Sequence, residues 1–194
     1  MPLPPTTNPW KTLKTTVAYE NSWVRLDHNE VLNPAGNPGI YGVVHFKNHA
    51  IGIVPVDDEG YTWLVGQYRY ALGAYEWEIP EGGCPVGTDP LATAKRELKE
   101  ETGLVAEEWR KLMDFHLSNS VTDEYGVAYL AKGLRQEAAE PEETEDLTLR
   151  RLPLAEAIRM TLDGRIRDAL SIMALQRVAL LGEEQTGYLA EDGL

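Results

Sequence analysis

Short runs of apolar and β-branched residues, separated by turn residues, fill the N-terminal part of the chain. Runs of this composition are typical of strands, because β-branched and aromatic side chains are enriched there. Clusters of Asn, Asp, Gly and Pro, such as the stretch 33–39, mark the turns between them. The pattern predicts strands at residues 17–20, 23–29, 41–46, 50–56, 61–68 and 75–79.

The periodicity then changes to that of a helix. Leu91, Ala94 and Leu98 fall on one stripe at about 100° per residue, and we expect this stripe to face a core. The helix is bounded by Asp89 as N-cap, Pro90 at the first position and Gly103 at the end. Further strands are predicted at 109–117, 125–131 and 147–152, and further helices at 153–162 and 168–181.

Strands first, a helix in the middle, strands again and helices last are typical of an α+β fold, here a sandwich of helices around a mixed sheet. We divide the chain into an N-terminal strand extension (1–40), a main domain (41–182) and a loose tail (183–194). Residues 1–8 are expected to be disordered, and the acidic stretch 137–146 is expected to be a solvated loop.

Charge and composition exclude several classes of protein. The chain has 18 Lys and Arg against 31 Asp and Glu, a net charge of −13, which argues against a nucleic-acid-binding surface. No apolar run approaches membrane-spanning length, and the first residues lack the apolar segment of a secretory signal. The single cysteine, Cys84, rules out an intramolecular disulfide, and we interpret it as a small loop residue rather than a nucleophile. We therefore expect a cytoplasmic protein.

Three carboxylates on the first helix have two interpretations. Glu97 and Glu101 are i,i+4 neighbours, and Glu100 lies one step further round the helix. They can form an ordinary solvated face, in which Arg96 pairs with Glu100. Alternatively they form a cation site, because hard oxygen ligands so close together suit Mg²⁺ or Mn²⁺.

The wider spacing favours the cation site. Residues 82–104, GGCPVGTDPLATAKRELKEETGL, resemble the Nudix box, which is written Gly, five residues, Glu, seven residues, Arg-Glu-apolar-x-Glu-Glu-x-Gly-apolar. One position departs, because Thr88 stands where the motif has its first Glu and cannot bring a charge to Arg96, although Asp89 beside it can partly substitute. The matching positions are Gly82, Arg96, Glu97, Leu98, Glu100, Glu101, Gly103 and Leu104.

The resemblance implies the Nudix sandwich fold and a hydrolase that splits a pyrophosphate linkage with Mg²⁺, or Mn²⁺ in its place. It implies Glu97, Glu101 and Glu100 as metal ligands, together with the backbone carbonyl of Glu81. Glu100 also stands among the catalytic candidates, as does Arg96, which would orient the glutamates.

Three segments around the box resemble one branch of the Nudix family in particular. GQYRY (66–70), EIPEGG (78–83) and SNSVTDE (118–124) resemble the ADP-ribose and nucleotide-sugar pyrophosphatase branch. By this resemblance a loop acid after the box is the general base, and Glu124 matches it, with Asp123 as the neighbouring candidate. Arg69 is either a phosphate clamp or a surface charge on a strand. The substrate-binding candidates are Arg69, Glu78, Gly82, Gly83 and Trp23, the glycines because they let backbone approach metal and phosphate.

The sequence does not decide which nucleotide sugar is the substrate. Asn119 and Ser120 occupy the place where ADP-ribose enzymes of this branch commonly have a proline, which leaves UDP-, GDP- and ADP-hexoses open beside ADP-ribose. The expected products are a nucleoside monophosphate and a sugar phosphate. The N-terminal strands are too few to bury a core of their own. The resemblance to related pyrophosphatases implies a homodimer in which these strands help to form the nucleotide pocket.

Two alternatives remain at this stage. Thr88 favours a non-catalytic Nudix-like sensor of nucleotide sugars, because it weakens the support of the box. A housecleaning hydrolase of nucleoside triphosphates shares the same box, although the extra N-terminal strands argue against it.

Overall fold

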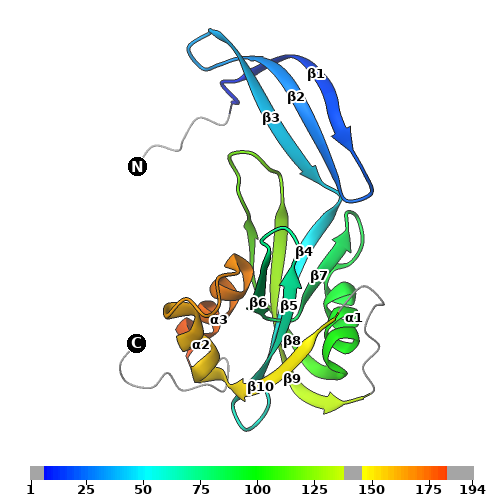
Figure 1. Ribbon diagram of the computed structural model, residues 1–194, viewed down its shortest axis with the longest axis vertical. Coiled ribbons are helices and arrows are strands. Elements are labelled where there is room, and N and C mark those ends of the chain that lie inside the picture. The colour runs from blue at the N-terminus through cyan, green and yellow to red at the C-terminus, as the bar shows by residue number, and fades with distance from the viewer. Residues whose placement is uncertain (1–6, 138–145, 183–194) are drawn as a thin grey trace. The chain divides into compact units, whose positions relative to one another are not determined.

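The computed structural model describes residues 7–137 and 146–182, and these form two compact units (Figure 1). Unit 1 comprises the residues up to Asn48 together with His116–Glu124, and unit 2 comprises His49–Phe115 and the residues from Tyr125 onward. The predictions for the first residues, for most of the acidic stretch and for the tail fall outside the described residues.

Unit 1 is built on a three-stranded antiparallel sheet in the order β1-β2-β3. A turn in which the Gly36 N–H donates to the Asn33 carbonyl joins the second strand to the third. The strands are longer than predicted, because cross-strand pairing continues through polar residues at their ends. The strands are β1 (Lys11–Glu20), β2 (Val24–Leu32) and β3 (Pro38–Phe46).

Unit 2 contains two sheets. One is a mixed four-stranded sheet, β7-β4-β9-β8, in which β4 and β9 run parallel; the other is three-stranded, in the order β10-β5-β6. The strands of the mixed sheet are β4 (Asn48–Pro55), β7 (Glu81–Pro85), β8 (Leu104–His116) and β9 (Tyr125–Gln136). Those of the other sheet are β5 (Tyr61–Arg69), β6 (Ala74–Glu78) and β10 (Thr148–Pro153).

Helices cover both faces of the mixed sheet (Figure 1). On β4, Ile53 packs in a cluster with residues of α1, whereas its neighbour Val54 packs in a cluster with residues of α2 and α3. This alternation follows from the period-two geometry of a strand. It confirms the predicted sandwich and α+β class. The helices are α1 (Pro90–Thr102), α2 (Leu154–Leu162) and α3 (Ala169–Leu181).

The three helices begin and end within a residue of their predicted bounds, but β7 was not predicted. The residues of β7 were interpreted as a loop because glycine and proline dominate them. They form a strand because β4 offers them a partner edge, with the Ile53 N–H donating to the Pro80 carbonyl just before it. The strand places Cys84 inside the core, where the residue is fully buried, so the prediction of a small loop residue is wrong.

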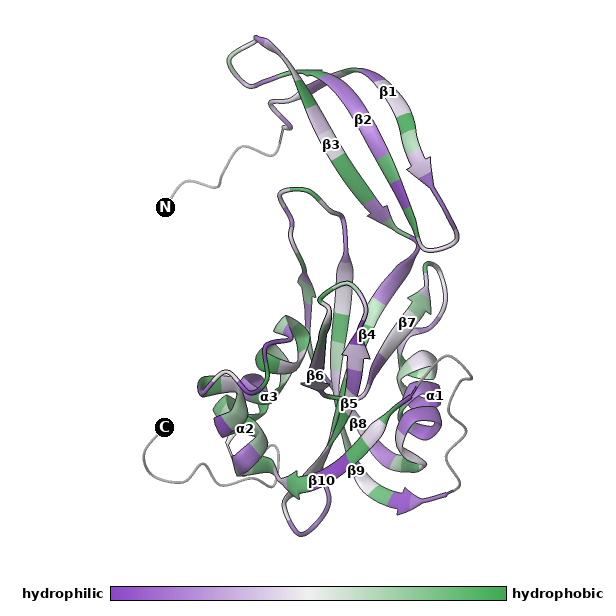
Figure 2. Ribbon diagram, viewed as in Figure 1, coloured by the Kyte–Doolittle hydropathy of each residue, from purple (hydrophilic) through white to green (hydrophobic). Residues whose placement is uncertain are grey.

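Helix α1 is hydrophilic over much of its length and buries one face only (Figure 2). Ala94 and Leu98 are fully buried, as the predicted stripe requires, and Leu91 packs against the same cluster. None of the helices in the described ranges is long and apolar enough to cross a membrane.

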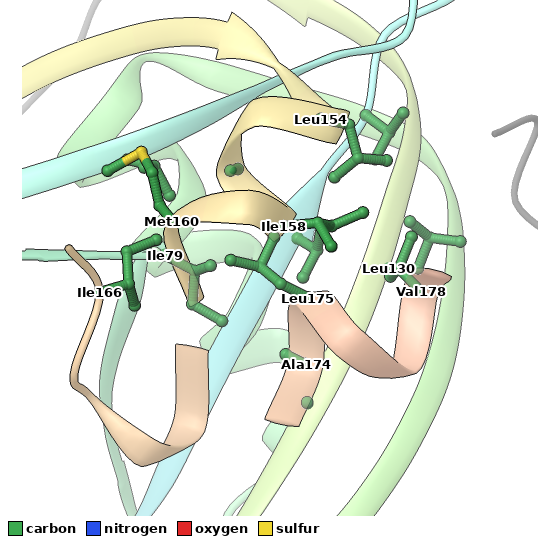
Figure 3. Packing of buried hydrophobic residues seen from close by; sticks show 14 of the residues in the cluster. Ile79, Leu130, Leu154, Ile158, Met160, Ile166, Ala174, Leu175 and Val178 are labelled. Atoms are coloured by element: carbon green, nitrogen blue, oxygen red, sulfur yellow. The ribbon is translucent and has the colours of Figure 1, made fainter. Parts of the chain in front are cut away.

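Leu175 lies at the centre of the cluster formed by α2, α3 and the sheet (Figure 3). Leu175→Ala is expected to lower the free energy of unfolding by about 2–5 kcal/mol, because it removes buried methyl groups and leaves a cavity. Leu180→Ala on the same helix is the matched control, since Leu180 is 81% exposed and its truncation should cost about 0.5 kcal/mol or less. Urea denaturation measures both, and equal losses would contradict the packing.

Candidate active site

Helix α1 turns two acids inward. Glu97 and Glu101 are 8% and 5% exposed, although charged side chains are seldom so buried without a compensating group. They lie one turn apart beside the buried Ala94 and Leu98, so the packing of the apolar stripe decides where they point. Glu100 is more exposed. The structure therefore brings the two principal predicted metal ligands to one buried face.

The ends of α1 hold these acids in register. The Leu91 N–H donates to the Asp89 carboxylate over 3.0 Å, and the Gly103 N–H donates to the Lys99 carbonyl over 2.8 Å. Gly103 has a φ of +70°, a left-handed conformation that glycine adopts at little cost. Both predicted caps are thus formed as expected from the local sequence.

The segment before the helix closes against the same acids. The Glu81 N–H donates to the Glu101 carboxylate over 3.0 Å. Gly82 lies so close to Glu97 that a Cβ atom added to it would overlap the Glu97 carboxylate. Any residue with a Cβ atom at position 82 would force the Glu97 carboxylate to move. The Glu81–Gly82 backbone thus lies against the helix acids, and its predicted approach to metal and phosphate stays a prediction.

Arg96 is held by acids of its own helix. Its Nη2 donates to Glu97 Oε1 over 2.5 Å, and its Nη1 pairs with Glu100. Burial alone would lower the pKa of the guanidinium, but these two carboxylates raise it above its ordinary value. The Arg96–Glu97 contact fits the predicted orienting role.

Thr88, the residue that departs from the box, is engaged locally. Its hydroxyl donates to the Pro85 carbonyl over 2.7 Å and lies 3.1 Å from the Cys84 sulfur. Asp89 serves as the helix cap, so its carboxylate is bound at the start of α1. The ion pairs that the structure gives Arg96 are those with Glu97 and Glu100, and Asp89 is absent from them in the described part of the chain.

Arg69 joins two acids from the neighbouring segment. Its Nε and Nη2 form a fork on Glu78, with distances of 2.5–3.0 Å, and Nη2 also donates to Glu81 over 2.6 Å. Burial would lower the pKa of Arg69, but its hydrogen bonds to Glu78 and the negative charge of Glu81 raise it strongly. Arg69 is therefore more than a surface charge on a strand, and its role as a phosphate clamp stays a prediction.

Asp168 completes a group that sequence analysis did not find. Carboxylate oxygens of Glu78, Glu81 and Asp168 lie within 4.8 Å of one another. Asp168 is the N-cap of α3, where its carboxylate accepts the Ser171 N–H over 2.6 Å. The Ser171 hydroxyl in turn accepts the Ile79 N–H over 2.9 Å, which ties the start of α3 to the end of β6.

The crowding of these acids changes the proton affinity of Glu81. Burial raises its pKa well above the ordinary value, and the nearby charges of Asp168 and Glu78 raise it further, while Arg69 opposes them. One Glu81 oxygen is buried without a hydrogen-bond partner among the described residues. Arg69 therefore offsets only part of the negative charge at this place.

Arg69→Met is expected to destabilise the protein by about 3 kcal/mol at about pH 8, because it leaves Glu78 and Glu81 buried without their counter-ion. The raised pKa of Glu81 sets the sign with pH. A carboxyl whose pKa is higher in the folded state takes up a proton as the pH falls, so the loss should shrink toward about pH 5. Arg135→Met is the control, since Arg135 forms an exposed pair with Glu107 worth about 0.5 kcal/mol or less. Urea denaturation at both pH values measures the two variants; a loss that grows with acidity would contradict the assignment.

The base candidates Asp123 and Glu124 belong to unit 1. The Asp123 carboxylate lies 2.6 Å from His45 Nδ1 and accepts the Phe46 N–H over 3.0 Å. Burial would raise the pKa of Asp123, but these bonds lower it overall. Asp123 is thus anchored to β3, and the Glu124 carbonyl accepts the Leu117 N–H over 3.1 Å. The general-base role of Glu124 stays a prediction.

The remaining substrate-binding candidates outside the acidic group, Trp23 and Gly83, are exposed. Trp23 is 68% exposed in the turn before β2, where its N–H donates to the Asn21 side chain over 2.8 Å. Gly83 is exposed on β7. Their contacts with a substrate stay predictions.

The donors on α1 fit a hard divalent cation. Two nearly buried carboxylates one turn apart repel each other, which a cation bound between them would relieve, and oxygen donors of this kind are those that Mg²⁺ prefers. Gly82 keeps the place of a side chain open beside Glu97, so the backbone of the preceding segment can approach the same point. The residues present are therefore suited to the metal that the box implies.

Comparison with known families agrees with this geometry. The family profile described as NUDIX domain matches residues 47–174, more than half of the chain. The chain belongs to the NUDIX domain family. A second profile, described as nucleoside diphosphate sugar hydrolase N-terminal domain, matches residues 10–44.

Relatives of this Nudix chain extend over most of its length. It is 37% identical to the ADP-ribose pyrophosphatase of Mycobacterium tuberculosis, over 87% of this chain and 83% of that protein. It is 34% identical to the methanol dehydrogenase activator of Bacillus methanolicus, over 88% of this chain and 92% of that protein. The solved structure of an ADP compounds hydrolase matches with a TM-score of 0.83 at 23% identity, covering 94% of this chain and 98% of that one. At that identity the structural match establishes the fold.

Proposed function

We propose that this Nudix protein is a Mg²⁺-dependent pyrophosphatase that cleaves nucleoside diphosphate sugars, ADP-ribose among them, to a nucleoside monophosphate and a sugar phosphate. The observation that carries the proposal is the buried pair Glu97 and Glu101, closed by the Glu81–Gly82 backbone. The match to a nucleoside diphosphate sugar hydrolase profile and the likeness to an ADP-ribose pyrophosphatase support the substrate class.

Charge explains why a cation is needed. A diphosphate is anionic and the chain has a net charge of −13, so the protein by itself repels its substrate. Glu97 and Glu101, with Glu100 and the Glu81 carbonyl, would hold the cation. When bound, it neutralises the diphosphate and lowers the pKa of a water molecule. Arg96 keeps Glu97 oriented through its ion pair.

The reaction requires a base and a leaving group. The oxygen of a water molecule attacks one phosphorus, the bond from that phosphorus to the bridging oxygen breaks, and the bridging oxygen leaves with the other phosphate. Glu124 accepts the proton of the attacking water in this proposal, with Asp123 as the alternative. The Asp123 carboxylate is held by His45 and by the Phe46 N–H in unit 1.

We further propose a homodimer formed through unit 1. Large apolar side chains of its sheet are exposed, among them Tyr19 at 58% and Ile40 at 72%. Exposed apolar residues clustered on one sheet are typical of an interaction surface. Light scattering coupled to gel filtration tests this: the full chain should have twice the monomer mass, and Ile40→Lys with Tyr19→Lys should shift it toward monomer. A monomeric wild-type protein would refute the dimer.

A substrate panel tests the activity. Purified protein with Mg²⁺ is incubated with ADP-ribose, UDP-, GDP- and ADP-hexoses and nucleoside triphosphates, and the products are separated by ion-exchange chromatography. Release of a nucleoside monophosphate and a sugar phosphate in equal amounts is the expected result. Binding without turnover in Mg²⁺ or Mn²⁺ would favour the sensor, and pyrophosphate release from triphosphates alone would favour the housecleaning hydrolase.

A further inference from the structure

A cavity of about 490 Å³ opens beside the acidic group, between the β5–β6 turn, β6 and the start of α3. Its walls differ in character. One part is apolar, and the other consists of carboxylates with a single guanidinium. The apolar lining is Leu72, Ala74 and Ala169, and the polar lining is Glu76, Glu78, Asp168 and Arg167.

Two of the three carboxylates that line this cavity, Glu76 and Glu78, are buried and paired with arginines, whereas Asp168 is partly buried. Glu76 and Glu78 are each 3% exposed. Glu76 forms an ion pair with Arg167, and Glu78 accepts the fork of Arg69. Asp168 caps α3, where the positive end of the helix dipole favours its charge. Most of the negative charge is thus compensated locally, while each carboxylate retains lone pairs beyond those used in its pairing.

The paired carboxylates and the apolar wall of the cavity favour a neutral ligand with hydroxyl groups. A phosphate group would be repelled by three carboxylates, and a cation would compete with two arginines already in place. Neutral hydroxyl groups meet neither obstacle, because they can donate to the carboxylate oxygens and accept from Arg167. Pockets with an apolar wall and a few polar groups that fix orientation are typical of small-molecule sites. The lining therefore suits a sugar ring.

The cavity is connected to the acids of α1 by successive contacts. Glu78 on its wall is bound to Arg69, Arg69 is bound to Glu81, and the Glu81 N–H donates to Glu101. We propose that this cavity binds the sugar on the far side of the diphosphate, the part released as sugar phosphate, through hydrogen bonds from its hydroxyls to Glu76 and Glu78. The proposal rests on the proposed function.

Two ligands that share adenosine and the diphosphate test it: ADP-ribose, and ADP whose terminal phosphate carries a methyl ester instead of ribose. Their affinities are measured by calorimetry on the full-length protein with Ca²⁺ in place of Mg²⁺, and kcat/KM is measured with Mg²⁺. Wild type should bind ADP-ribose about tenfold or more tightly than the methyl ester, since the methyl group makes none of the hydrogen bonds that ribose hydroxyls make with the lining.

Ala169→Phe fills the cavity from an exposed position at the start of α3, so the fold should be kept. The preference for ADP-ribose should fall to near unity, through weaker ADP-ribose binding with methyl-ester binding unchanged. Glu76→Gln preserves shape and should reduce the preference several-fold. Leu180→Phe, near the other end of the same helix at a side chain that is 81% exposed, is the control and should leave the preference at the wild-type value. Melting temperatures confirm that each variant is folded.

The proposal would be overturned if wild type bound ADP-ribose and the methyl ester with nearly equal affinity. It would also be overturned if the Ala169→Phe variant kept the full preference for ADP-ribose, or bound both ligands more weakly by the same factor. The binding ratio is measured without turnover. Failure of wild type to hydrolyse either compound would therefore refute the proposed function by itself. The ratio of the two affinities measured by calorimetry would still test whether the cavity binds the sugar.

Discussion

Glu101→Gln is expected to lower kcat for cleavage of the diphosphate by about 100- to 10,000-fold, because it removes a carboxylate that holds the cation. The fold should be retained, since the amide oxygen of glutamine can still accept the Glu81 N–H that Glu101 accepts. Initial rates with Mg²⁺ and a substrate identified by the panel measure the loss. Calorimetric titration with Mn²⁺ should show weaker binding in the same variant.

Glu108→Gln is the matched control, because Glu108 is exposed on β8 and the substitution removes the same charge. It should leave kcat within about twofold of the wild-type value. Equal rates in the Glu101 and Glu108 variants would refute the assignment of α1 as the metal-binding element.

Gly82→Ala is expected to reduce activity by about 100-fold without unfolding the protein, because the new Cβ overlaps the Glu97 carboxylate and moves it. Displacement of a buried carboxylate also separates it from Arg96, which orients it. The rate at saturating substrate and the dependence of the rate on Mg²⁺ concentration measure the effect. The Mg²⁺ concentration for half-maximal rate should rise.

Gly42→Ala provides the control, because Gly42 has open space around its Cα and no positive φ. The same methyl group there should change neither the rate nor the Mg²⁺ requirement. If Gly82→Ala were fully active at wild-type Mg²⁺ concentrations, the close approach of Gly82 to Glu97 would have no part in the reaction.

The local parts of the site followed from sequence because each depends on residues close together in the chain. Asp89, Pro90 and Gly103 bound a helix through contacts that span four residues or fewer, and the helix period places Glu97 and Glu101 on one face. The apolar stripe of Ala94 and Leu98 then decides that this face is buried.

Contacts between distant segments could not be derived in the same way. Asp168 is remote in sequence from Glu78 and Glu81, and its local pattern indicates only a helix cap. Their meeting depends on Ser171, which accepts the Ile79 N–H and ties α3 to β6. The pairing of Arg69 with Glu78 needs the hairpin register of β5 and β6, in which Arg69 lies opposite Ala74.

The strand β7 shows the same limit. Its glycines and proline predict a loop, and only the free edge of β4 makes the segment a strand. That strand in turn brings Gly82 against Glu97. Whether such a segment forms a strand depends on its pairing partner more than on its own residues. The close approach of Gly82 to Glu97 therefore could not be predicted from the local sequence.

The sequence by itself determined the acidic helix, its caps, its buried stripe and the α+β order of elements, because hydrophobic periodicity and capping act within one or two turns. The tertiary structure alone decided that Arg69 pairs with Glu78 and Glu81, that Asp168 joins them, and that a cavity lies beside them. The physical reason is that pairing across a sheet and docking of a helix bring together charges that no local interaction places, and burial then strengthens their mutual effect.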